Sequence, residues 1–493
     1  MKNDISNNFE EFNNFLLEKM KEWDIPGMAI GIIKDDEIIY ASGLGLRDVN
    51  KNLEATENTL FAIGSASKSF TTLAIGILVD EGKLDLDTPI KKYMPSFEMH
   101  NKYAEEHLTL RDMLCHRSGL PRHDALWYNS SLSRKELVGR IKYLEFSKDF
   151  RETWQYNNLM YATVGYIIEL ITGVTWEEFV KTRILEPLGM NSTNFSVDVS
   201  KKSADYSQPY SQKGDKIYQT NFRNIDTLGP AGSINSNLTD MLKWLNLHLN
   251  KGNLNGKQII SEKNISKLHS PQVPCQLLPL NFDELGFSSY GLGWFIESYR
   301  GKKHVNHGGN IDGFCSYISF LPDENIGVVI LSNLANPFCT MPIAYHIYDK
   351  ILEYDYIDWN KKLKAEGAKM FKAMEGANEA VRNSKKEITT PSHSSEEYTG
   401  TYEDLGYGAL KIETKDNSLK LTYNNIEYTL NHKCYDIFTM TIMEYYVIDV
   451  TFNYDSNGNI KSVSIPLEQS VKEIMFTKCK LDEKSTGTYK TMV

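Results

Sequence analysis

The chain has 493 residues and a formal net charge of −10, with 41% apolar and 24% charged residues. This length allows roughly two to four domains with a large core, and the composition is typical of a soluble globular protein. The negative charge argues against nucleic-acid binding, which would need a basic face. The six cysteines are scattered and lack metal-like spacing, so we expect no metal site. No run of about 18 apolar residues occurs, so we expect no membrane span. Because the sequence shows no signal region, we expect a cytoplasmic location.

The first elements are a helix and a hairpin. Apolar residues recur at helical spacing over residues 9–23, and a Pro-Gly pair ends the pattern. Residues 28–33 and 38–42 are short apolar runs on either side of a polar turn. This arrangement predicts two antiparallel strands after the N-terminal helix.

Ser65 and Lys68 stand at the start of an almost uncharged apolar run, residues 71–79, which predicts a buried helix closed by Gly82. Three residues apart on the first turn, the two side chains share a face, so the hydroxyl and the amine form a candidate nucleophile and base. Burial or neighbouring cations would lower the pKa of the lysine, and the helix N-terminus would favour the anionic oxygen. Taken alone, the pair also fits a serine N-cap followed by a solvated lysine.

Two later segments carry polar side chains beside predicted helices. Residues 108–121 predict a helix with a threonine cap, and His116 near its end could be catalytic but is better explained as a structural histidine bonded to backbone. Tyr156 and Asn158 precede a helix over residues 159–170. A tyrosine there relays a proton if cations depress its pKa, and an asparagine bonds both a lysine and a substrate amide. The plainer alternative is an aromatic staple with an asparagine N-cap.

A further helix opens with a cap at Asn237 and has an apolar face over residues 238–249. His248 lies off that face, so we predict that it is a surface residue. Residues 193–233 and 250–290 are rich in Ser, Asn, Gly and Pro, which predicts long loops of the kind that line substrate clefts.

Paired glycines follow His307 directly and precede two strong strand patterns, residues 314–321 and 326–331. Paired glycines on a strand mark a place where a ligand or another backbone approaches closely, and His307 would face the same space. In isolation, a glycine bulge beside a surface histidine explains the pattern as well.

The chain changes character after the strands. Over residues 359–381, apolar residues recur with spacings of three, four and seven among Lys, Glu and Ala, which predicts a long helix, and the polar segment 389–395 indicates a linker. Beyond it, roughly eight short alternating strands predict a small antiparallel barrel or sandwich. We therefore expect three parts: a first domain at 1–355, a helical linker at 356–395 and a β domain at 396–493.

In this order, Ser-x-x-Lys, Tyr-x-Asn and His-Gly-Gly resemble the motifs of the penicillin-recognising serine hydrolases, which include class C β-lactamases, DD-peptidases, related esterases and aminopeptidases. The matching residues are Ser65, Lys68, Tyr156, Asn158, His307, Gly308 and Gly309. The resemblance covers about residues 8–350, and the β domain resembles the lipocalin-like domain of some members. It implies an α/β (α+β) fold of the β-lactamase/transpeptidase type, with a helical region on a mainly antiparallel sheet and a C-terminal all-β barrel. Helices from about residue 9 and at 341–352 would cover that sheet.

The resemblance also implies the catalytic groups. Ser65 would be the acylated nucleophile, with Lys68 and Tyr156 as the proton-transfer pair. We find no counterpart of the deacylating glutamate of class A enzymes in the sequence. Activation of the hydrolytic water would therefore fall to Tyr156 and Lys68.

The implied binding groups surround this pair. Asn158 would orient the lysine and the substrate amide. The backbone N–H groups of Ser65 and of Asn310, which follows Gly309, would form the oxyanion hole. His307 stands where many relatives have a lysine, and a neutral imidazole is a poorer partner for a substrate carboxylate than an ammonium.

We therefore predict a serine hydrolase that cleaves an amide, peptide, β-lactam or ester bond through an acyl-enzyme on Ser65. Without a signal peptide, a cytosolic peptidase, D-amino-acid amidase or esterase is at least as well supported as a cell-wall DD-carboxypeptidase or a periplasmic β-lactamase. The alternative is a non-hydrolytic ligand-binding or sensor protein that retains the fold. We expect a small-molecule or peptide substrate, no cofactor and no nucleic-acid or membrane partner. The β domain would cap the cleft, narrow it or mediate homo-oligomer formation.

Overall fold

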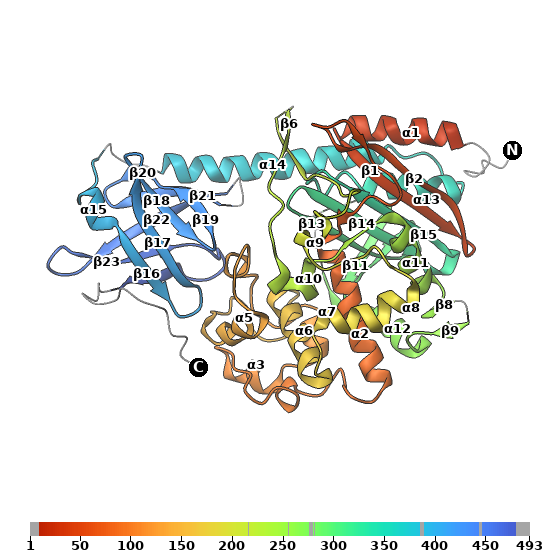
Figure 1. The fold of residues 1–493 in the computed structure, drawn as a ribbon, viewed down its shortest axis with the longest axis horizontal. Helices are drawn as coiled ribbons and strands as arrows, with labels where there is room; N and C mark the ends of the chain where they lie inside the picture. Colours follow the sequence, from red (N-terminus) through yellow and green to blue (C-terminus); the bar gives the residue numbers. More distant parts are fainter. Residues whose placement is uncertain are drawn as a thin grey trace. The chain divides into compact units, whose positions relative to one another are not determined.

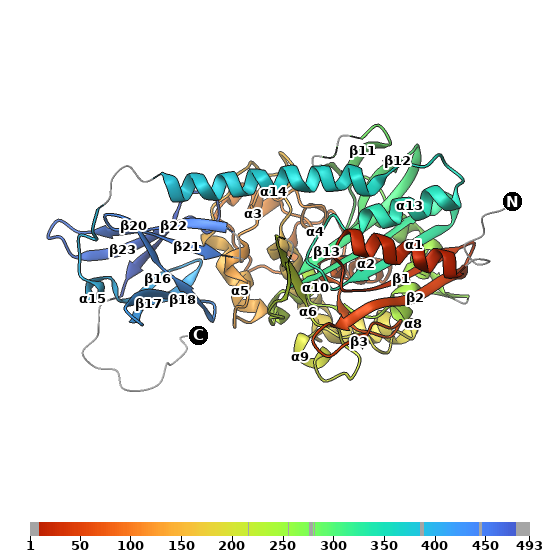
Figure 2. The ribbon, with the colours of Figure 1, turned by 90° about the horizontal axis from the view of Figure 1, so that it is seen from above.

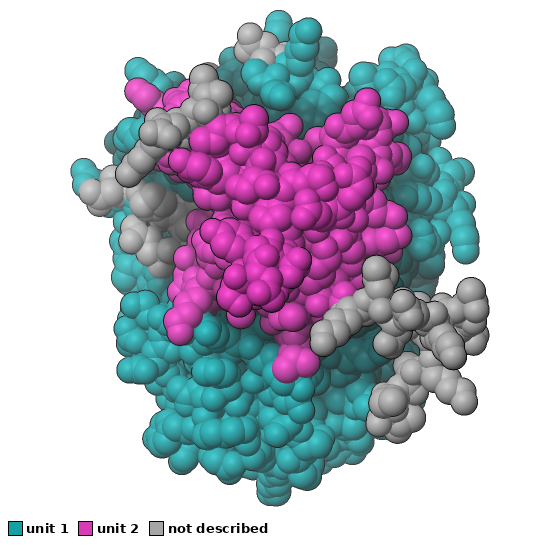
Figure 3. Space-filling view, turned by 90° about the vertical axis from the view of Figure 1, so that its left-hand side faces the viewer, with its two compact units in different colours: residues 1–370 teal, residues 371–493 magenta. Residues whose placement is uncertain are grey.

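The computed structural model describes residues 9–214, 216–254, 256–275, 280, 282–384, 389–442 and 446–479 (Figure 1). Residues 1–8, in which we expect no signal region, and the end of the predicted β domain, 480–493, lie outside the described residues. The chain divides into two compact units, residues 1–370 and 371–493 (Figure 3). The boundary falls within α14 (Trp359–Asn383), the long helix expected in this stretch. The division at residues 355 and 395 stays a prediction.

A nine-stranded sheet forms the centre of the first unit. Its order is β10-β11-β12-β13-β14-β15-β1-β2-β3, and every neighbouring pair is antiparallel, which confirms the predicted sheet type. The strands are β1 (Gly27–Lys34), β2 (Glu37–Asp48), β3 (Leu53–Glu54), β10 (Val273–Pro274), β11 (Leu285–Tyr290), β12 (Phe295–Tyr299), β13 (Lys302–Ile311), β14 (Phe314–Leu321) and β15 (Ile326–Ser332).

Helices α1 (Phe9–Glu22) and α13 (Met341–Ile351) cover one face of this sheet, as predicted (Figure 2). Phe12 of α1 and Ile343 of α13 lie in one buried cluster with Ile30 of β1. Removal of such side chains from water contributes roughly 25 cal/mol per Å² of apolar surface, so this layer stabilises the sheet where the helices cover it.

Helix α11 (Leu238–Leu249) packs on the opposite face of the sheet. Successive residues of a strand point to opposite sides of a sheet, so the residues next to those that face α1 and α13 face α11. Two glycines allow the close approach. A Cβ at Gly31 would lie 2.8 Å from Leu242, and a Cβ at Gly327 would lie 2.6 Å from Leu245. The leucine side chains therefore fill the space that larger strand residues would occupy.

The prediction that His248 is a surface residue is wrong. Its side chain is 2% exposed, and its Nδ1 lies 2.9 Å from Nε2 of His269, which follows α12 (Glu262–Leu268). The ring also packs 4.8 Å from that of Trp294. Helix α11 is thus covered on a second flank, which the spacing of its aliphatic residues does not indicate.

The remaining helices of the first unit form the helical region. They are α2 (Ser67–Asp80), α3 (Lys102–His107), α4 (Leu110–Leu114), α5 (Arg134–Arg140), α6 (Asn158–Thr172), α7 (Trp176–Val180), α8 (Glu186–Leu188), α9 (Val197–Ser200) and α10 (Gly229–Gly232). Among the described residues, no single helix is long and apolar enough to cross a membrane. Helix α6 and the run Trp176–Leu188, which are bent by 78° relative to each other, pass that test only as a pair.

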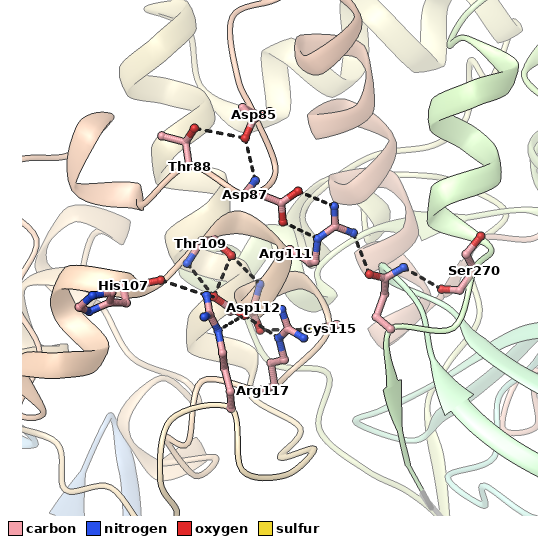
Figure 4. Close-up of polar contacts among 12 residues, drawn as sticks. Asp85, Asp87, Thr88, His107, Thr109, Arg111, Asp112, Cys115, Arg117 and Ser270 are labelled. Carbon is pink, nitrogen blue, oxygen red and sulfur yellow. Dashed lines mark hydrogen bonds and ion pairs between the residues drawn. The ribbon is translucent and has the colours of Figure 1, made fainter.

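A buried carboxylate fixes the loop after α4 (Figure 4). Asp112 accepts hydrogen bonds from Arg117 Nε at 2.6 Å, Arg151 Nη2 at 2.7 Å and Thr109 Oγ1 at 2.8 Å. Burial alone would raise the pKa of Asp112, but the bonds from Arg151 and Thr109 and the charge of Arg117 hold that pKa below its usual value. Asp112 therefore stays ionised and ties the end of α4 to the segment before Tyr156.

The second unit is a nearly closed antiparallel barrel, as predicted, and its described residues form nine strands where about eight were expected. Its order is β19-β18-β17-β16-β24-β23-β22-β21-β20, and the two end strands are consecutive in the chain, separated by Leu430 alone. A short helix, α15 (Ser395–Tyr398), precedes it. The strands are β16 (Gly400–Asp404), β17 (Gly408–Lys415), β18 (Ser418–Tyr423), β19 (Ile426–Thr429), β20 (Asn431–Cys434), β21 (Ile437–Ile442), β22 (Tyr446–Tyr454), β23 (Ile460–Ile465) and β24 (Ile474–Lys478).

Candidate active site

Ser65 lies in a 3-10 turn, η2 (Gly64–Ala66), that leads directly into α2. The N-cap of α2 is Ala66, and no side chain caps the helix, so the alternative of a serine cap does not hold. Gly64 has a φ of +52°, and a Cβ at this position would lie 3.0 Å from the backbone nitrogen of Asn310. Only glycine fits this conformation and this contact without strain.

Lys68 is fully buried and its amine is surrounded by three oxygen atoms. Nζ lies 3.2 Å from Ser65 Oγ, 2.8 Å from Asn158 Oδ1 and 2.8 Å from the carbonyl oxygen of Ala231. Burial, and then the positive charge of Arg122, lower the pKa of Lys68 well below its ordinary value. A neutral amine has two hydrogens for the two strong acceptors, which leaves its lone pair toward Ser65. This arrangement suits a general base.

Tyr156 lies against the same amine. Lys68 Nζ is 4.7 Å from the centre of the tyrosine ring, and the Arg122 guanidinium carbon is 5.1 Å from it. Burial raises the pKa of Tyr156 far more than a side-chain hydrogen bond with Ser65 and the charge of Arg122 lower it. The charge of Arg122 does lower this pKa, but burial outweighs it, so Tyr156 is a neutral phenol that carries its proton.

Asn158 is the first residue of α6, and its neighbour Asn157 is the cap, with Oδ1 accepting from Met160 N at 2.9 Å. The Asn158 amide is held at both ends: Oδ1 accepts from Lys68, and Nδ2 donates to Asp124 Oδ1 at 3.0 Å. Its oxygen is thus fixed toward the lysine. The amide nitrogen of Asn158, which we expected to contact the substrate, donates to the carboxylate of Asp124 in this structure.

His116 makes the backbone bond predicted for a structural histidine. Its Nδ1 accepts from the backbone N–H of Asn157 at 3.1 Å, and its ring centre lies 4.3 Å from that of Tyr156. His116 is fully buried and has a φ of 61°, at the start of the loop that Asp112 anchors. It supports the segment that carries Tyr156.

Strand β13 brings the third motif beside Ser65. A Cβ at Gly309 would lie 1.9 Å from the carbonyl oxygen of Ile63, and Ser316 of β14 donates to that oxygen at 2.7 Å. Strand β12 pairs with β13 only as far as Asn306, so residues 307–311 lie beyond the described β12 ladder. The strand therefore passes close to the turn that carries Ser65.

His307 is neutral, and both of its ring nitrogens are engaged. Nδ1 lies 2.6 Å from the Gly308 carbonyl oxygen, and Nε2 lies 3.0 Å from the Tyr290 hydroxyl. Because a carbonyl only accepts, Nδ1 carries the hydrogen and Nε2 accepts from Tyr290. Burial, and then the charge of Lys68, lower the pKa of His307 to about 3. This histidine is a weak anchor for a carboxylate.

Sequence reasoning missed Arg122, Asp124 and Tyr290. Asp124 accepts from Arg122 Nε at 2.5 Å and from Trp127 Nε1 at 2.7 Å, and it links both residues to Asn158. The Arg-His-Asp run directly after the Ser-Gly-Leu-Pro segment is a signal that could have pointed to the first two. Tyr290 gives no such signal, because its contact with His307 depends on the register of three strands.

Comparison with protein families assigns the class of this fold and site. A model of the beta-lactamase family matches residues 12–348, and a model described as a domain of unknown function (DUF3471) matches residues 384–478. The chain belongs to the beta-lactamase family, which confirms the resemblance predicted from the motifs, and with it the general class of serine hydrolase.

Individual relatives agree with this class. The chain is 28% identical over 434 residues to "Unguisins hydrolase ungD'" of Aspergillus campestris, covering 82% of this chain and 77% of the relative. It is 27% identical over 354 residues to "Protein flp" of Staphylococcus aureus, covering 70% and 67%. An octameric penicillin-binding protein homologue from Pyrococcus abyssi has a TM-score of 0.61 at 25% identity, covering 95% of this chain and 100% of that one.

Proposed function

We propose that the protein hydrolyses amide, peptide or ester bonds through an acyl-enzyme on Ser65. The observation that carries this proposal is the buried Lys68, whose amine lies 3.2 Å from Ser65 Oγ and has a strongly lowered pKa. A neutral lysine at this distance accepts the serine proton as the oxygen attacks the substrate carbonyl. A ligand-binding relic would have no need to keep this amine buried and deprotonated.

The proton follows a short route. Ser65 Oγ attacks, its proton moves to Lys68, and the carbonyl oxygen becomes an oxyanion that the backbone N–H groups of Ser65 and Asn310 stabilise. Tyr156 passes its proton to the departing amine or alcohol as the tetrahedral intermediate collapses, and it takes in return the proton that Lys68 received from Ser65. A water molecule then attacks the acyl group, gives its proton to the Lys68–Tyr156 pair and releases the acid with Ser65 restored.

Within the family we favour a peptidase, amidase or esterase over a carboxypeptidase that recognises a substrate carboxylate. Both nitrogens of His307 are engaged and its pKa is lowered, so it offers no cation at the third motif. The relative named as an unguisins hydrolase supports hydrolysis as the reaction. Turnover of β-lactams is a separate property of the same site, and reaction with a penicillin measures it.

Intact-protein mass spectrometry after reaction with a fluorophosphonate, and separately with a penicillin, tests the proposal. We expect a fluorophosphonate adduct on the wild type and none on Ser65→Ala, whose fold should persist because no side chain caps α2. A penicillin adduct on the wild type would add β-lactams to the substrates. If neither reagent modifies the wild type, the acyl-enzyme proposal is wrong.

We also propose a homo-oligomer, since the solved relative from Pyrococcus abyssi is described as octameric. Light scattering of the purified protein over a range of concentrations measures the mass in solution. A mass of one chain at every concentration would contradict this assignment.

A further inference from the structure

A chain of hydrogen bonds leads from Arg122 to the buried Lys68, and the steps above do not use its outer part. Arg122 Nε donates to Asp124 Oδ2 at 2.5 Å. Asp124 opens the 3-10 turn η4 (Asp124–Leu126), and its Oδ1 accepts from Asn158 Nδ2 at 3.0 Å. The Arg122 side chain is 50% exposed and that of Asp124 is 13% exposed. Asp124 therefore joins a charge in contact with water to the interior of the site.

Asp124 determines which end of the Asn158 amide faces Lys68. Because a carboxylate only accepts hydrogen bonds, the NH2 group of Asn158 must point to Asp124, and Oδ1 then points to the lysine amine, 2.8 Å away. In the reversed amide, the NH2 group would face Lys68 and occupy the lone pair of its amine. That lone pair could then not accept the proton of Ser65. A carboxylate at position 124 excludes the reversed orientation.

Arg122 offsets the negative charge that this arrangement brings near the amine. A carboxylate without a cationic partner would favour the ammonium form of Lys68. After burial, the charge of Arg122 lowers the pKa of Lys68 and the charge of Asp124 raises that pKa. The guanidinium carbon lies 5.1 Å from the centre of the Tyr156 ring, and Lys68 Nζ lies 4.7 Å from the same centre. The guanidinium is therefore close enough to oppose a second positive charge on the amine.

Apart from Ser65, the other titratable side chains around Lys68 are uncharged. They are Tyr156, Tyr161, His116 and His307. Burial raises the pKa of both tyrosines and lowers the pKa of both histidines. Among the described residues, Arg122 and Asp124 are thus the charged groups that act on Lys68. The protonation of the amine depends on the balance between these two.

We propose that Asp124 and Arg122 are positioning residues for the general base: Asp124 fixes the Asn158 amide, and Arg122 offsets the charge of Asp124. The proposal rests on the acyl-enzyme function and assigns roles to two residues that the steps above leave out. Both residues act through Lys68, but in separable ways. The charge of Arg122 determines the pH at which the amine becomes a base, and the orientation imposed by Asp124 determines the rate once it is one.

The rate of fluorophosphonate labelling of Ser65, measured across pH, tests the role of Arg122. In Arg122→Gln the midpoint of the profile should rise by about half a pH unit or more, the effect of one charge partly screened by water. Labelling below the midpoint should then be slower by about threefold or more, with an unchanged plateau at high pH. Arg122→Lys keeps the charge and should restore the wild-type midpoint.

Arg183→Gln is the matched control. Arg183 also donates to a carboxylate, that of Glu81, and its guanidinium carbon lies 5.4 Å from the centre of the Phe179 ring. Glu81 directly follows α2, so it lies roughly 20 Å from Lys68 along the helix, at about 1.5 Å per residue. This variant removes the same kind of ion pair far from the amine, and it should keep both the midpoint and the plateau.

The role of Asp124 is tested by Asp124→Asn in the same profile. An asparagine both donates and accepts, so it tolerates either orientation of the Asn158 amide. We expect the plateau rate to fall by about 10-fold or more, because part of the molecules present no lone pair to Ser65. The midpoint should not rise, since the variant removes a negative charge. Loss of folded protein alone would lower the labelled amount without changing the rate.

The outcomes separate this proposal from the acyl-enzyme function. If the wild type is not labelled, the acyl-enzyme function fails. If the wild type is labelled but Arg122→Gln keeps its midpoint, or if Arg122→Lys moves the midpoint as far as Arg122→Gln, the role of Arg122 is wrong. A wild-type plateau in Asp124→Asn would overturn the role of Asp124. The side chain of Arg122 is half-exposed, so its variants test the proposal even if Asp124→Asn fails to fold.

Discussion

The chemistry of this site depends on the protonation of one side chain, Lys68. Its amine lies 2.8 Å from each of two fixed acceptors and is removed from water, so the ammonium form loses more by burial than it gains from its neighbours. Asn158 and the Ala231 carbonyl orient the lone pair toward Ser65. The same burial keeps His307 neutral, so the site combines two uncharged nitrogen groups near Ser65, the proposed nucleophile.

Lys68→Ala should slow acylation of Ser65 by roughly 10²–10⁴-fold, because the general base is lost. The wild-type acylation rate should rise with pH through the lowered pKa of Lys68, since only the neutral amine accepts a proton. Stopped-flow measurement of fluorophosphonate labelling across pH tests both statements. An unchanged rate in Lys68→Ala would remove this residue from the mechanism.

The same pKa also affects stability. Between the lowered pKa of Lys68 and the ordinary lysine value, the unfolded chain binds one proton more than the folded chain, so the free energy of unfolding rises with pH in that window. Lys68→Ala should remove this contribution, whereas Lys92→Ala, at an exposed position, should keep it. Urea unfolding at several pH values measures the slope, and equal slopes in the two variants would contradict the assigned protonation state.

Among the elements, the contact between η2 and β13 determines the geometry of the site. Strand β13 reaches the nucleophile turn because glycine occupies both sides of the contact, at Gly64 and at Gly309. Neighbouring Gly308 has ordinary space around it, with Ser316 O at 3.4 Å from an added Cβ. The two consecutive glycines therefore differ in how well they tolerate a larger side chain, although they are neighbours in the sequence.

Gly309→Ala should displace β13 from η2, since its Cβ would lie 1.9 Å from the Ile63 carbonyl oxygen. We expect a loss of about 1–3 kcal/mol in stability and at least about 100-fold in acylation, because the oxyanion donors would move relative to Ser65. Gly308→Ala is the control and should retain most of both. Thermal unfolding and labelling rates compare the two, and equal behaviour would show that β13 has room to move.

The sequence predicted the elements of the site better than their contacts. The spacing of Ser65 and Lys68 on one helical turn and the glycines of β13 follow from local chemistry, so they could be read from the chain. The bond from Tyr290 to His307 and the burial of His248 arise from packing between segments far apart in sequence. Periodicity carries no information about such pairs.

At the scale of the whole molecule, the chain combines two units with separate cores. The first unit contains every residue of the candidate site, and the second is a β barrel whose end strands are joined by Leu430. The chemistry assigned above therefore needs no residue of the barrel.

Deletion of the chain from about residue 390 should leave a folded hydrolase that still labels at Ser65, with an altered range of substrates. The physical reason is that the core of the first unit, including α1, α13 and the sheet, lies within residues 1–370. Circular dichroism, fluorophosphonate labelling and hydrolysis of a panel of amides and esters test this expectation on the shortened chain. An insoluble or unlabelled product would mean that the barrel is required for the folding of the catalytic unit.

The glycine contact between η2 and β13 also has a consequence for protein engineering. Two backbones touch there, so the spacing of the oxyanion donors does not depend on any rotamer and should survive extensive change in the surrounding loops. Libraries directed at the surrounding loops would therefore vary what the enzyme accepts while the reacting atoms keep their places. Libraries directed at residues 63–65 or 309 should yield mostly inactive clones.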